Sequence, residues 1–473
     1  MTPAPPKLKP IASGVPSFLD PSRPVKSLSV AFWLWKAILF VVIISCPGLG
    51  YDTSASLLPF QLNGSAEVIS SAEPKHVSLP IPLKFVRWDS IYFVHIAQYG
   101  YLFEQEWAFS YVYGGLAKFL SSLLFISDDS SWVTQVAGTA IVLSHVSHYL
   151  SVLALYRLSA NVFGCDTERS RLVCFLSAAL HIVCPGGAFL SAPYGESLFS
   201  FLNITGYYIY SSSCHDLSSK RYFLSHGKLV LSGCFFAVAT SVRSNGILSG
   251  VLLAYDALWQ VYNILSRRSV GTVIVRLGCT IISGCIVALG LLIPQYLAYT
   301  SYCTGKDGSR PWCQSLLPSI YGWVQSHYWG VGFLKYWTVP NIPLFLLATP
   351  MLLILFLSSL WALGAHISPS SPGTTLKTCS TLSSSPASSL LTQLAISQFI
   401  LTVMAVTSYH VQIVNRISSG YPLWYWYLVW RALGTSDTTQ SARNRTQVLF
   451  VVQLMVAYAL VQSVLFGSFL PPA

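Results

Sequence analysis

The chain has 473 residues, of which 53% are hydrophobic and only 9% are charged, and its mean hydropathy is +0.57. Soluble globular proteins carry about 25% charged residues, so this composition excludes a soluble protein and predicts an all-α polytopic membrane protein. The net charge of +11 comes from Lys and Arg in short loops, without a basic run interleaved with aromatic residues, and therefore does not indicate nucleic-acid binding.

The N-terminal segment, 1–28, is rich in proline and basic, and it lacks the short apolar region and cleavage site of a signal peptide. The first apolar run, from about Leu28 to Leu49, is long enough to cross a bilayer. We therefore interpret 1–28 as a cytosolic tail and the first run as a retained membrane anchor. The remainder, 29–470, is predicted to be one multi-spanning domain.

About eleven apolar runs are predicted to be transmembrane helices. They cover 29–48, 132–156, 172–191, 196–212, 228–242, 246–265, 272–300, 341–363, 390–410, 422–433 and 447–468. The run 110–126 is also apolar, but a full span there would break the distribution of basic residues. We interpret it as a helix that dips into the membrane and returns.

The distribution of basic residues orients these spans. The segments assigned to the cytosol carry 17 of the 27 Lys and Arg residues, as the positive-inside rule requires, while Lys36 lies inside the first span. The loops 51–131 and 301–340 are then lumenal. The Ser/Thr/Pro-rich stretch within 364–389 is predicted to be a flexible cytosolic linker. Asn63 begins an Asn-Gly-Ser sequon in the first lumenal loop, which makes it a glycosylation candidate.

The first lumenal loop contains the triplet Arg87-Trp88-Asp89, followed by residues that predict a short interfacial helix with His95 on its more polar side. Trp88 suits the headgroup region. Asp89 has two interpretations: it caps the helix that follows, or it is a carboxylate that takes a proton from a substrate hydroxyl. The spacing does not decide between them. Glu104 lies shortly after this helix and is a further candidate.

Four further polar islands fall on the same predicted side of the membrane. Each has a structural alternative: a carboxylate at a helix N-terminus, an arginine reaching for water, or an interfacial aromatic belt. The islands contain Glu196 at a Pro-Tyr-Gly turn, Arg243 and Asn245 between two spans, Gln325 and Trp329 in a Trp/Tyr-rich stretch, and His410, Gln412 and Arg416. Their common side predicts one shared lumenal cavity.

The eleven cysteines show neither a CxxC motif nor a zinc-binding spacing. Most lie in apolar runs, where cysteine usually acts as a small hydrophobic residue. Cys303 and Cys313 differ because they flank the short polar loop TGKDGSRPW on the lumenal side. They are candidates for a disulfide.

In their order, the polar islands resemble the phosphatidylinositol-glycan class V family. The matching stretches are RWDSIYFVHIAQYGY with FEQEWAFSY, PYGESLFSFL, RSNGIL, the aromatic YGWVQSHYWGVGFLKYW, and HVQIVNR with PLWYW, from about residue 84 to 427. Two features depart from the pattern: WAFSYVYGG stands where a Phe-Pro pair is expected, and the linker 364–389 has no counterpart. Neither touches the candidate residues.

This resemblance implies a GT-C type fold and transfer of the second, α-1,6-linked mannose of the glycosylphosphatidylinositol (GPI) anchor from dolichyl-phosphate mannose, on the lumenal side of the endoplasmic reticulum. It implies Asp89 as the catalytic base, by its match to the acidic residue in the family's first lumenal loop. A lipid monophosphate donor implies no metal and no other cofactor. The implied substrate-binding residues are Arg87, Trp88, His95, Glu104, Glu196, Arg243, Asn245, Gln325, Trp329, His410, Gln412 and Arg416.

Three other functions are compatible with parts of the sequence. A transporter or lipid scramblase would place its charges at the membrane midplane, whereas here they gather at one rim. A non-catalytic subunit of a glycosylation complex would not need Asp89. A GT-C mannosyltransferase with another lipid-linked acceptor would use the same site chemistry, and only the family resemblance argues against it. The resemblance does not decide whether a small membrane subunit is needed.

Overall fold

The computed structural model describes residues 20–46, 80–125, 132–266, 270–304, 310–364, 390–434 and 438–470. Within these ranges the chain is helical, with no β-strand. The glycosylation candidate Asn63 and nearly all of the predicted linker 364–389 lie outside them.

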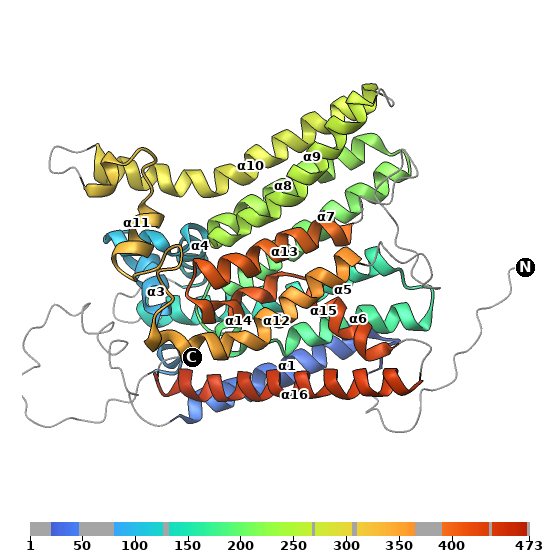
Figure 1. Cartoon of the computed structure of the whole chain (residues 1–473). Helices are drawn as coiled ribbons and strands as arrows, with labels where there is room; N and C mark the ends of the chain where they lie inside the picture. The colour runs from blue at the N-terminus through green and yellow to red at the C-terminus, as the bar shows by residue number, and fades with distance from the viewer. Residues whose placement is uncertain are drawn as a thin grey trace, which may run out of the picture.

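The main helices form a bundle whose members run along a common direction (Figure 1). Each of the predicted apolar runs overlaps one of these helices. Their order in the chain is α1 (Pro24–Ser45), α5 (Trp132–Phe163), α6 (Glu168–Ile182), α7 (Glu196–Ser218), α8 (Tyr222–Val242), α9 (Gly250–Leu265), α10 (Val270–Cys303), α12 (Ile342–Gly364), α13 (Leu390–Thr407), α15 (Leu423–Leu433) and α16 (Thr438–Gly467). The all-α polytopic class is thereby confirmed.

Short helices gather at one end of the bundle, on the left in Figure 1, which we call the α3 end. These are α3 (Ser90–Tyr99), α4 (Tyr111–Leu124), α11 (Ile320–His327) and α14 (Val414–Ile417), with the 3-10 turns η2 (Ile81–Phe85), η3 (Glu104–Ala108), η4 (Gly187–Leu190), η5 (Ser244–Ser249), η6 (Pro311–Gln314), η7 (Val339–Asn341), η8 (Val411–Ile413) and η9 (Ser418–Gly420). The predicted polar islands lie in these connections.

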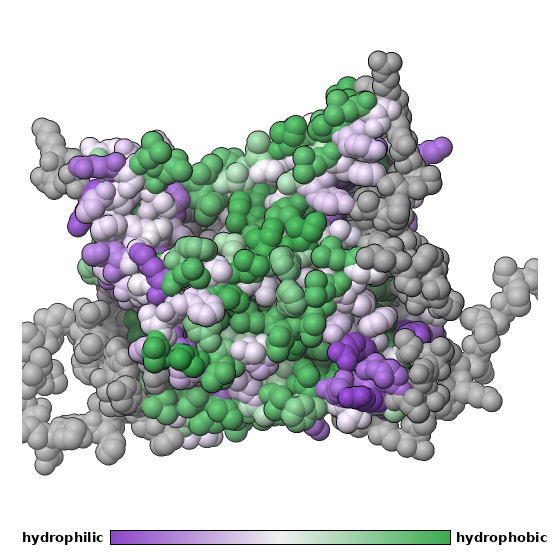
Figure 2. Space-filling view, in the orientation of Figure 1, coloured by the Kyte–Doolittle hydropathy of each residue, from purple (hydrophilic) through white to green (hydrophobic). Residues whose placement is uncertain are grey.

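Seven of the described helices are long and apolar enough to cross a membrane: α1, α5, α8, α10, α12, α13 and α16. The predicted count of eleven spans is therefore not confirmed. Helices α6, α9 and α15 have only 15, 16 and 11 residues, and α7 has 23 residues but many buried polar side chains. A broad hydrophobic surface crosses the middle of the bundle, with hydrophilic residues toward both ends (Figure 2). Such a band is what a lipid environment requires.

Helix α10 carries Pro294 near the α3 end. A proline has no backbone N–H, so it leaves the carbonyl four residues earlier without its helical donor. That carbonyl belongs to Gly290, and the Ser241 hydroxyl of α8 donates to it at 2.8 Å. Gly290 also packs directly on the backbone of Ala237, where a side chain would not fit. The carbonyl freed by Pro294 and the close approach at Gly290 thus hold α8 against α10.

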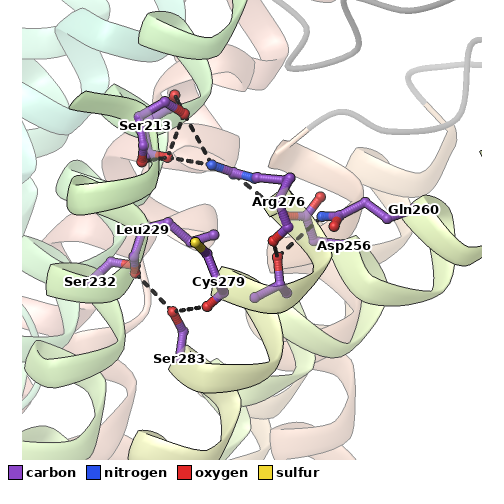
Figure 3. Close-up of polar contacts among 10 residues, drawn as sticks. Ser213, Leu229, Ser232, Asp256, Gln260, Arg276, Cys279 and Ser283 are labelled. Atoms are coloured by element: carbon purple, nitrogen blue, oxygen red, sulfur yellow. Dashed lines mark hydrogen bonds and ion pairs between the residues drawn. The ribbon is translucent and has the colours of Figure 1, made fainter. Parts of the chain in front are cut away.

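At the opposite end, α9 and α10 are fastened to α7 and α8 by a buried arginine (Figure 3). The Arg276 guanidinium donates to the hydroxyls of Ser213 at 2.8 Å and Ser225 at 3.1 Å, and it lies 3.4 Å from the Asp256 carboxylate. The side chains of Arg276 and Asp256 are only 4% and 14% exposed. A charge this deep must be paired to be tolerated.

We expect Arg276→Met to destabilise the protein by about 3 kcal/mol, because it leaves the Asp256 carboxylate buried without its cation. The measurement is the thermal unfolding midpoint of the purified protein in detergent. The double variant Arg276→Met/Asp256→Leu is the control, since replacing a whole buried ion pair by apolar side chains is often neutral. An unchanged midpoint in the single variant would show that the contacts of Arg276 do not stabilise the protein.

Candidate active site

A cavity of about 450 Å³ opens at the α3 end of the bundle, within the roughly 300–1,000 Å³ typical of small-molecule sites. Its walls come from α3, η3, α4, η4, α8, η5, α10, α11, η8, α14 and α16. Of the predicted site residues, those that line it are Trp88, Asp89, Arg243, Asn245, Gln325, Trp329, His410, Gln412 and Arg416. Segments more than 300 residues apart therefore meet around one space.

Asp89 stands at the N-cap position of α3, but its side chain accepts no hydrogen bond from the helix backbone. Its Oδ2 instead lies 3.4 Å from both Nη1 and Nη2 of Arg416. The side chain is 43% exposed and lines the cavity. Helix capping therefore does not account for this carboxylate, which remains available to a ligand.

The backbone before Asp89 is held in an unusual conformation. Trp88 has φ 54°, a region that bulky residues rarely occupy and that costs about 1–3 kcal/mol. Neighbouring groups impose it: the Arg87 carbonyl accepts from the Tyr194 hydroxyl at 2.8 Å and the Ser90 hydroxyl at 2.6 Å. The indole of Trp88 donates to the Leu470 carbonyl at 3.1 Å. The strain directs Trp88 and Asp89 toward the cavity.

Arg416 is the central cation of the cavity. Its guanidinium carbon lies 4.3 Å from the ring centre of Phe189 and 5.7 Å from that of Tyr194, and its Nε lies 3.7 Å from Glu196 Oε1. Its backbone carbonyl accepts from the Ser419 hydroxyl at 2.8 Å. Stacking leaves the edge of a guanidinium free for anionic partners. Arg416 is thus oriented between Asp89 and Glu196.

Glu196 supplies the second carboxylate from below the cavity. It is fully buried in the first turn of α7, where the helix dipole favours negative charge. Its Oε1 lies 2.7 Å from Nη1 of Arg243, which is 18% exposed and lines the cavity. Two arginines and two carboxylates therefore balance one another here. Of the two carboxylates, Asp89 is exposed to the cavity and Glu196 is not.

His410 and Gln412 come from the segment after α13. The Gln412 side-chain oxygen accepts from the Tyr336 hydroxyl at 3.3 Å, and the Tyr336 ring contacts His410 edge-on. Burial lowers the pKa of His410 below its usual value near 6.5, and the attraction of Asp89 does not restore it. A neutral imidazole at pH 7 suits hydrogen bonding to a sugar better than binding of a phosphate.

Four predicted site residues do not line the cavity: Glu196, described above, and three others. Arg87 is buried behind it, with its guanidinium over the Phe469 ring. His95 is bonded through Nδ1 to Glu106 at 2.5 Å, and the same carboxylate accepts from the backbone N–H of Leu102 at 2.7 Å. These groups order the chain around α3 instead of reaching the cavity.

The third of these residues, Glu104, is 7% exposed and faces the loop after α10. Its carboxylate accepts from the Trp312 indole at 3.2 Å and from the Tyr328 hydroxyl at 3.2 Å. A disulfide joins Cys303 to Cys313 in this loop, with 5.7 Å between the Cα atoms. Glu104 therefore connects η3 to the loop that carries α11.

One wall of the cavity contains residues that were not among the predicted site residues. Gln295, just after Pro294, accepts through its side-chain oxygen from the Ser319 hydroxyl at 3.1 Å and the Tyr321 backbone N–H at 3.3 Å. The Tyr321 hydroxyl accepts from Ser244 at 2.9 Å. An amide beside a proline within a long apolar helix was a usable signal for Gln295. Phe189 had none, because it is one of 25 phenylalanines.

Among the described residues, no group of three or more His, Cys, Asp or Glu side chains is arranged to hold a metal ion. The charged groups that line the cavity are the guanidinium ions of Arg243 and Arg416 and the carboxylate of Asp89, with the Glu196 carboxylate buried against both arginines. Chemically, this arrangement can bind a phosphate with the arginines while a carboxylate accepts a proton nearby.

Comparison with known proteins gives consistent matches along the whole chain. The family model described as "Mannosyltransferase (PIG-V)" matches residues 29–473. A protein of Aspergillus oryzae named "GPI mannosyltransferase 2" is 52% identical over 98% of this chain and 99% of its own length. The protein of that name in Saccharomyces cerevisiae is 30% identical over 95% of this chain and all of its own length. The crystal structure of the Archaeoglobus fulgidus oligosaccharyltransferase in the apo form aligns with a TM-score of 0.46 at 12% identity, over 92% of this chain and 56% of that one.

The lowered pKa of His410 predicts a pH-dependent contribution to stability. At pH values below about 6.5 the unfolded chain protonates this histidine while the folded one resists it. The unfolded state then binds more protons, so stability falls as the pH falls. We expect His410→Gln to lose less thermal stability than the wild-type chain between pH 7 and pH 5. Substitution of the exposed His215 by Gln is the control, and equal slopes for all three proteins would contradict the expectation.

Proposed function

The chain belongs to the mannosyltransferase (PIG-V) family, and we propose that it transfers the second, α-1,6-linked mannose of the GPI anchor. The donor in this proposal is dolichyl-phosphate mannose, and the acceptor is the GPI precursor that already carries one mannose. The observation that carries the proposal is the cavity itself, in which a half-exposed carboxylate, Asp89, stands beside the guanidinium of Arg416.

We place this reaction at the lumenal face of the endoplasmic reticulum membrane, in a GT-C type enzyme with a cytosolic N-terminus. The support is the distribution of basic residues. The segments predicted to be cytosolic carry 17 of the 27 Lys and Arg residues, as cytosolic segments do. The cavity then opens on the other side, where a lipid-linked mannose and a GPI precursor can reach it together.

In the proposed reaction, Asp89 takes the proton of the acceptor's 6-hydroxyl as its oxygen attacks the anomeric carbon of the donor mannose. The bond between that carbon and the phosphate oxygen breaks, and the electron pair leaves with dolichyl phosphate. A β-linked donor and an α-linked product require one inversion. A single displacement achieves this, so the reaction needs one base and forms no covalent intermediate.

The leaving phosphate gains a negative charge, and Arg416 and Arg243 are placed to stabilise it. Arg416 is held only loosely by Asp89, at 3.4 Å, so an incoming phosphate can replace the carboxylate as its partner. That exchange leaves Asp89 free to accept a proton. Glu196 stays buried against Arg243 at 2.7 Å and fixes it in place.

The aromatic and amide side chains opposite these charges suit the sugars. Trp329 and Tyr321 offer ring faces, and Gln325, Asn245 and Gln412 offer hydrogen-bonding groups along the same cavity. The proposed donor carries a single phosphate whose charge the arginines can neutralise, so the proposal assigns no metal to the site. Testing lipid-linked oligosaccharide as acceptor distinguishes this reaction from the nearest alternative, a GT-C mannosyltransferase with another acceptor.

We expect Asp89→Asn to lower mannose transfer by about 10²–10⁴-fold, because an amide cannot accept the hydroxyl proton. The measurement uses microsomes that lack the native enzyme, supplied with dolichyl-phosphate mannose and the one-mannose GPI intermediate. Accumulation of this intermediate at normal protein levels supports the assignment. The control is Glu168→Gln, the same exchange at an exposed carboxylate on α6. Near-normal transfer by Asp89→Asn would exclude Asp89 as the base.

We expect Arg416→Lys to weaken inhibition by dolichyl phosphate, the proposed product, by about tenfold or more. A lysine keeps the charge but loses the planar guanidinium that stacks on Phe189 and reaches a phosphate with two N–H groups. The inhibition constant of dolichyl phosphate is the measurement, so the result does not depend on the base. An unchanged constant would remove Arg416 from the phosphate site.

A further inference from the structure

Lys36 is a basic residue buried in the middle of α1, where an ammonium group is costly. Lys36 is only 3% exposed. Among the described residues, no carboxylate forms an ion pair with it. Its Nζ instead donates to the Leu190 carbonyl and to the Ser191 hydroxyl, each at 2.8 Å. Both partners lie more than 150 residues away, in and just after η4.

These hydrogen bonds fasten a stretch that has little regular structure to hold it. Helix α6 ends at Ile182 and α7 begins at Glu196, so the backbone between them lacks the continuous hydrogen bonding of a helix. The Leu190 carbonyl receives a second donor, the Ser197 hydroxyl, at 2.9 Å. Buried carbonyls need such donors. Lys36 reaches the Leu190 carbonyl from α1, and the Ser144 hydroxyl of α5 donates to the Ala192 carbonyl of the same stretch at 2.8 Å.

The stretch fastened by Lys36 supplies three contacts to the charged centre. Phe189 carries the ring on which Arg416 stacks, at 4.3 Å. Tyr194 donates to the Arg87 carbonyl at 2.8 Å, which holds the backbone of the Arg-Trp-Asp triplet. Glu196 forms the ion pair with Arg243 at 2.7 Å. Phe189 directly precedes Leu190, and Tyr194 and Glu196 follow it within six residues.

We propose that Lys36 is a positioning residue for mannosyl transfer: by holding η4, it keeps Phe189, Tyr194 and Glu196 where they orient Arg416 and Asp89. Lys36 itself does not touch the substrates. The inference rests on the proposed function, because it assigns to Lys36 a role in placing the phosphate-binding and base residues of that reaction.

A role in positioning differs measurably from a role in stability. An unpaired ammonium group is costly to bury, so replacing Lys36 by an apolar side chain removes that cost together with two hydrogen bonds. Misplacement of catalytic groups by about 1 Å can nevertheless cost on the order of 100-fold in rate. Lys36→Met nearly keeps the length of the side chain and removes its ammonium group, with both the charge and the hydrogen-bond donors, so it separates these two effects.

We expect Lys36→Met to lower kcat by on the order of 10–100-fold, with the KM for the acceptor and the thermal unfolding midpoint close to wild type. Ser191→Ala, which removes one of the two acceptors, should give a smaller loss in the same direction. Lys26→Met is the matched control, because Lys26 is exposed on the same helix. Unchanged kcat in Lys36→Met would overturn the proposal.

Backbone amide hydrogen exchange tests the anchor without enzymatic activity. In Lys36→Met, exchange should rise at 187–196 and stay unchanged across the other long helices, whereas Lys26→Met should change neither. A rise along the whole chain with a lowered unfolding midpoint would identify a general stability role and overturn positioning. If the wild-type chain transfers no mannose, the proposed function fails; unchanged exchange at 187–196 overturns the anchor in either case.

Discussion

The cavity depends on one interaction, the placement of the Arg416 guanidinium between Asp89 and Glu196 on the face of the Phe189 ring. An arginine held this deep needs both compensating charge and a surface to stack on. The two carboxylates provide the charge and the ring provides the surface. Asp89 is the less firmly held of the two and the more exposed, so it is the partner that a ligand phosphate can displace. The resting ion pair thus keeps the proposed base in place and the proposed phosphate site neutral.

This centre is assembled from elements that are unrelated in sequence, and each is supported by polar groups buried in the bundle. The carbonyl of Ser419, three residues after Arg416, accepts from Ser200 at 3.0 Å and from Tyr425 at 3.2 Å, and His181 lies 2.7 Å from that tyrosine hydroxyl. Across the bundle, Lys36 supports the turn that carries Phe189. Helix α7 is too polar to satisfy a membrane-span criterion because it carries part of this support. The buried polar side chains that distinguish α7 from an apolar span therefore also hold the residues of the charged centre in place.

Much of this organisation could be predicted from the sequence. Hydrophobic runs located the helices, and alternation of the spans put Asp89, Arg243 and Arg416 on one side, where one cavity now contains them. What periodicity cannot give is the direction of a side chain at a helix end. Arg87 and Asp89 are two residues apart, yet one turns behind the cavity and the other into it, because Trp88 between them has a positive φ. The pairing of Glu104 with the loop after α10 is also set by tertiary contacts alone.

The predicted number of spans exceeds the seven described helices that are long and apolar enough to cross a membrane, and the reason bears on the site. Helices α6, α9 and α15 are short because the chain leaves the helical path near the α3 end, at the turns that carry Phe189, Asn245 and Arg416. Irregular backbone at membrane depth is tolerated only where it is buried in protein or lines a cavity. All three turns meet this condition, because Phe189, Asn245 and Arg416 line the cavity. Shortened helices in an otherwise apolar chain therefore mark where the backbone was released to build the site.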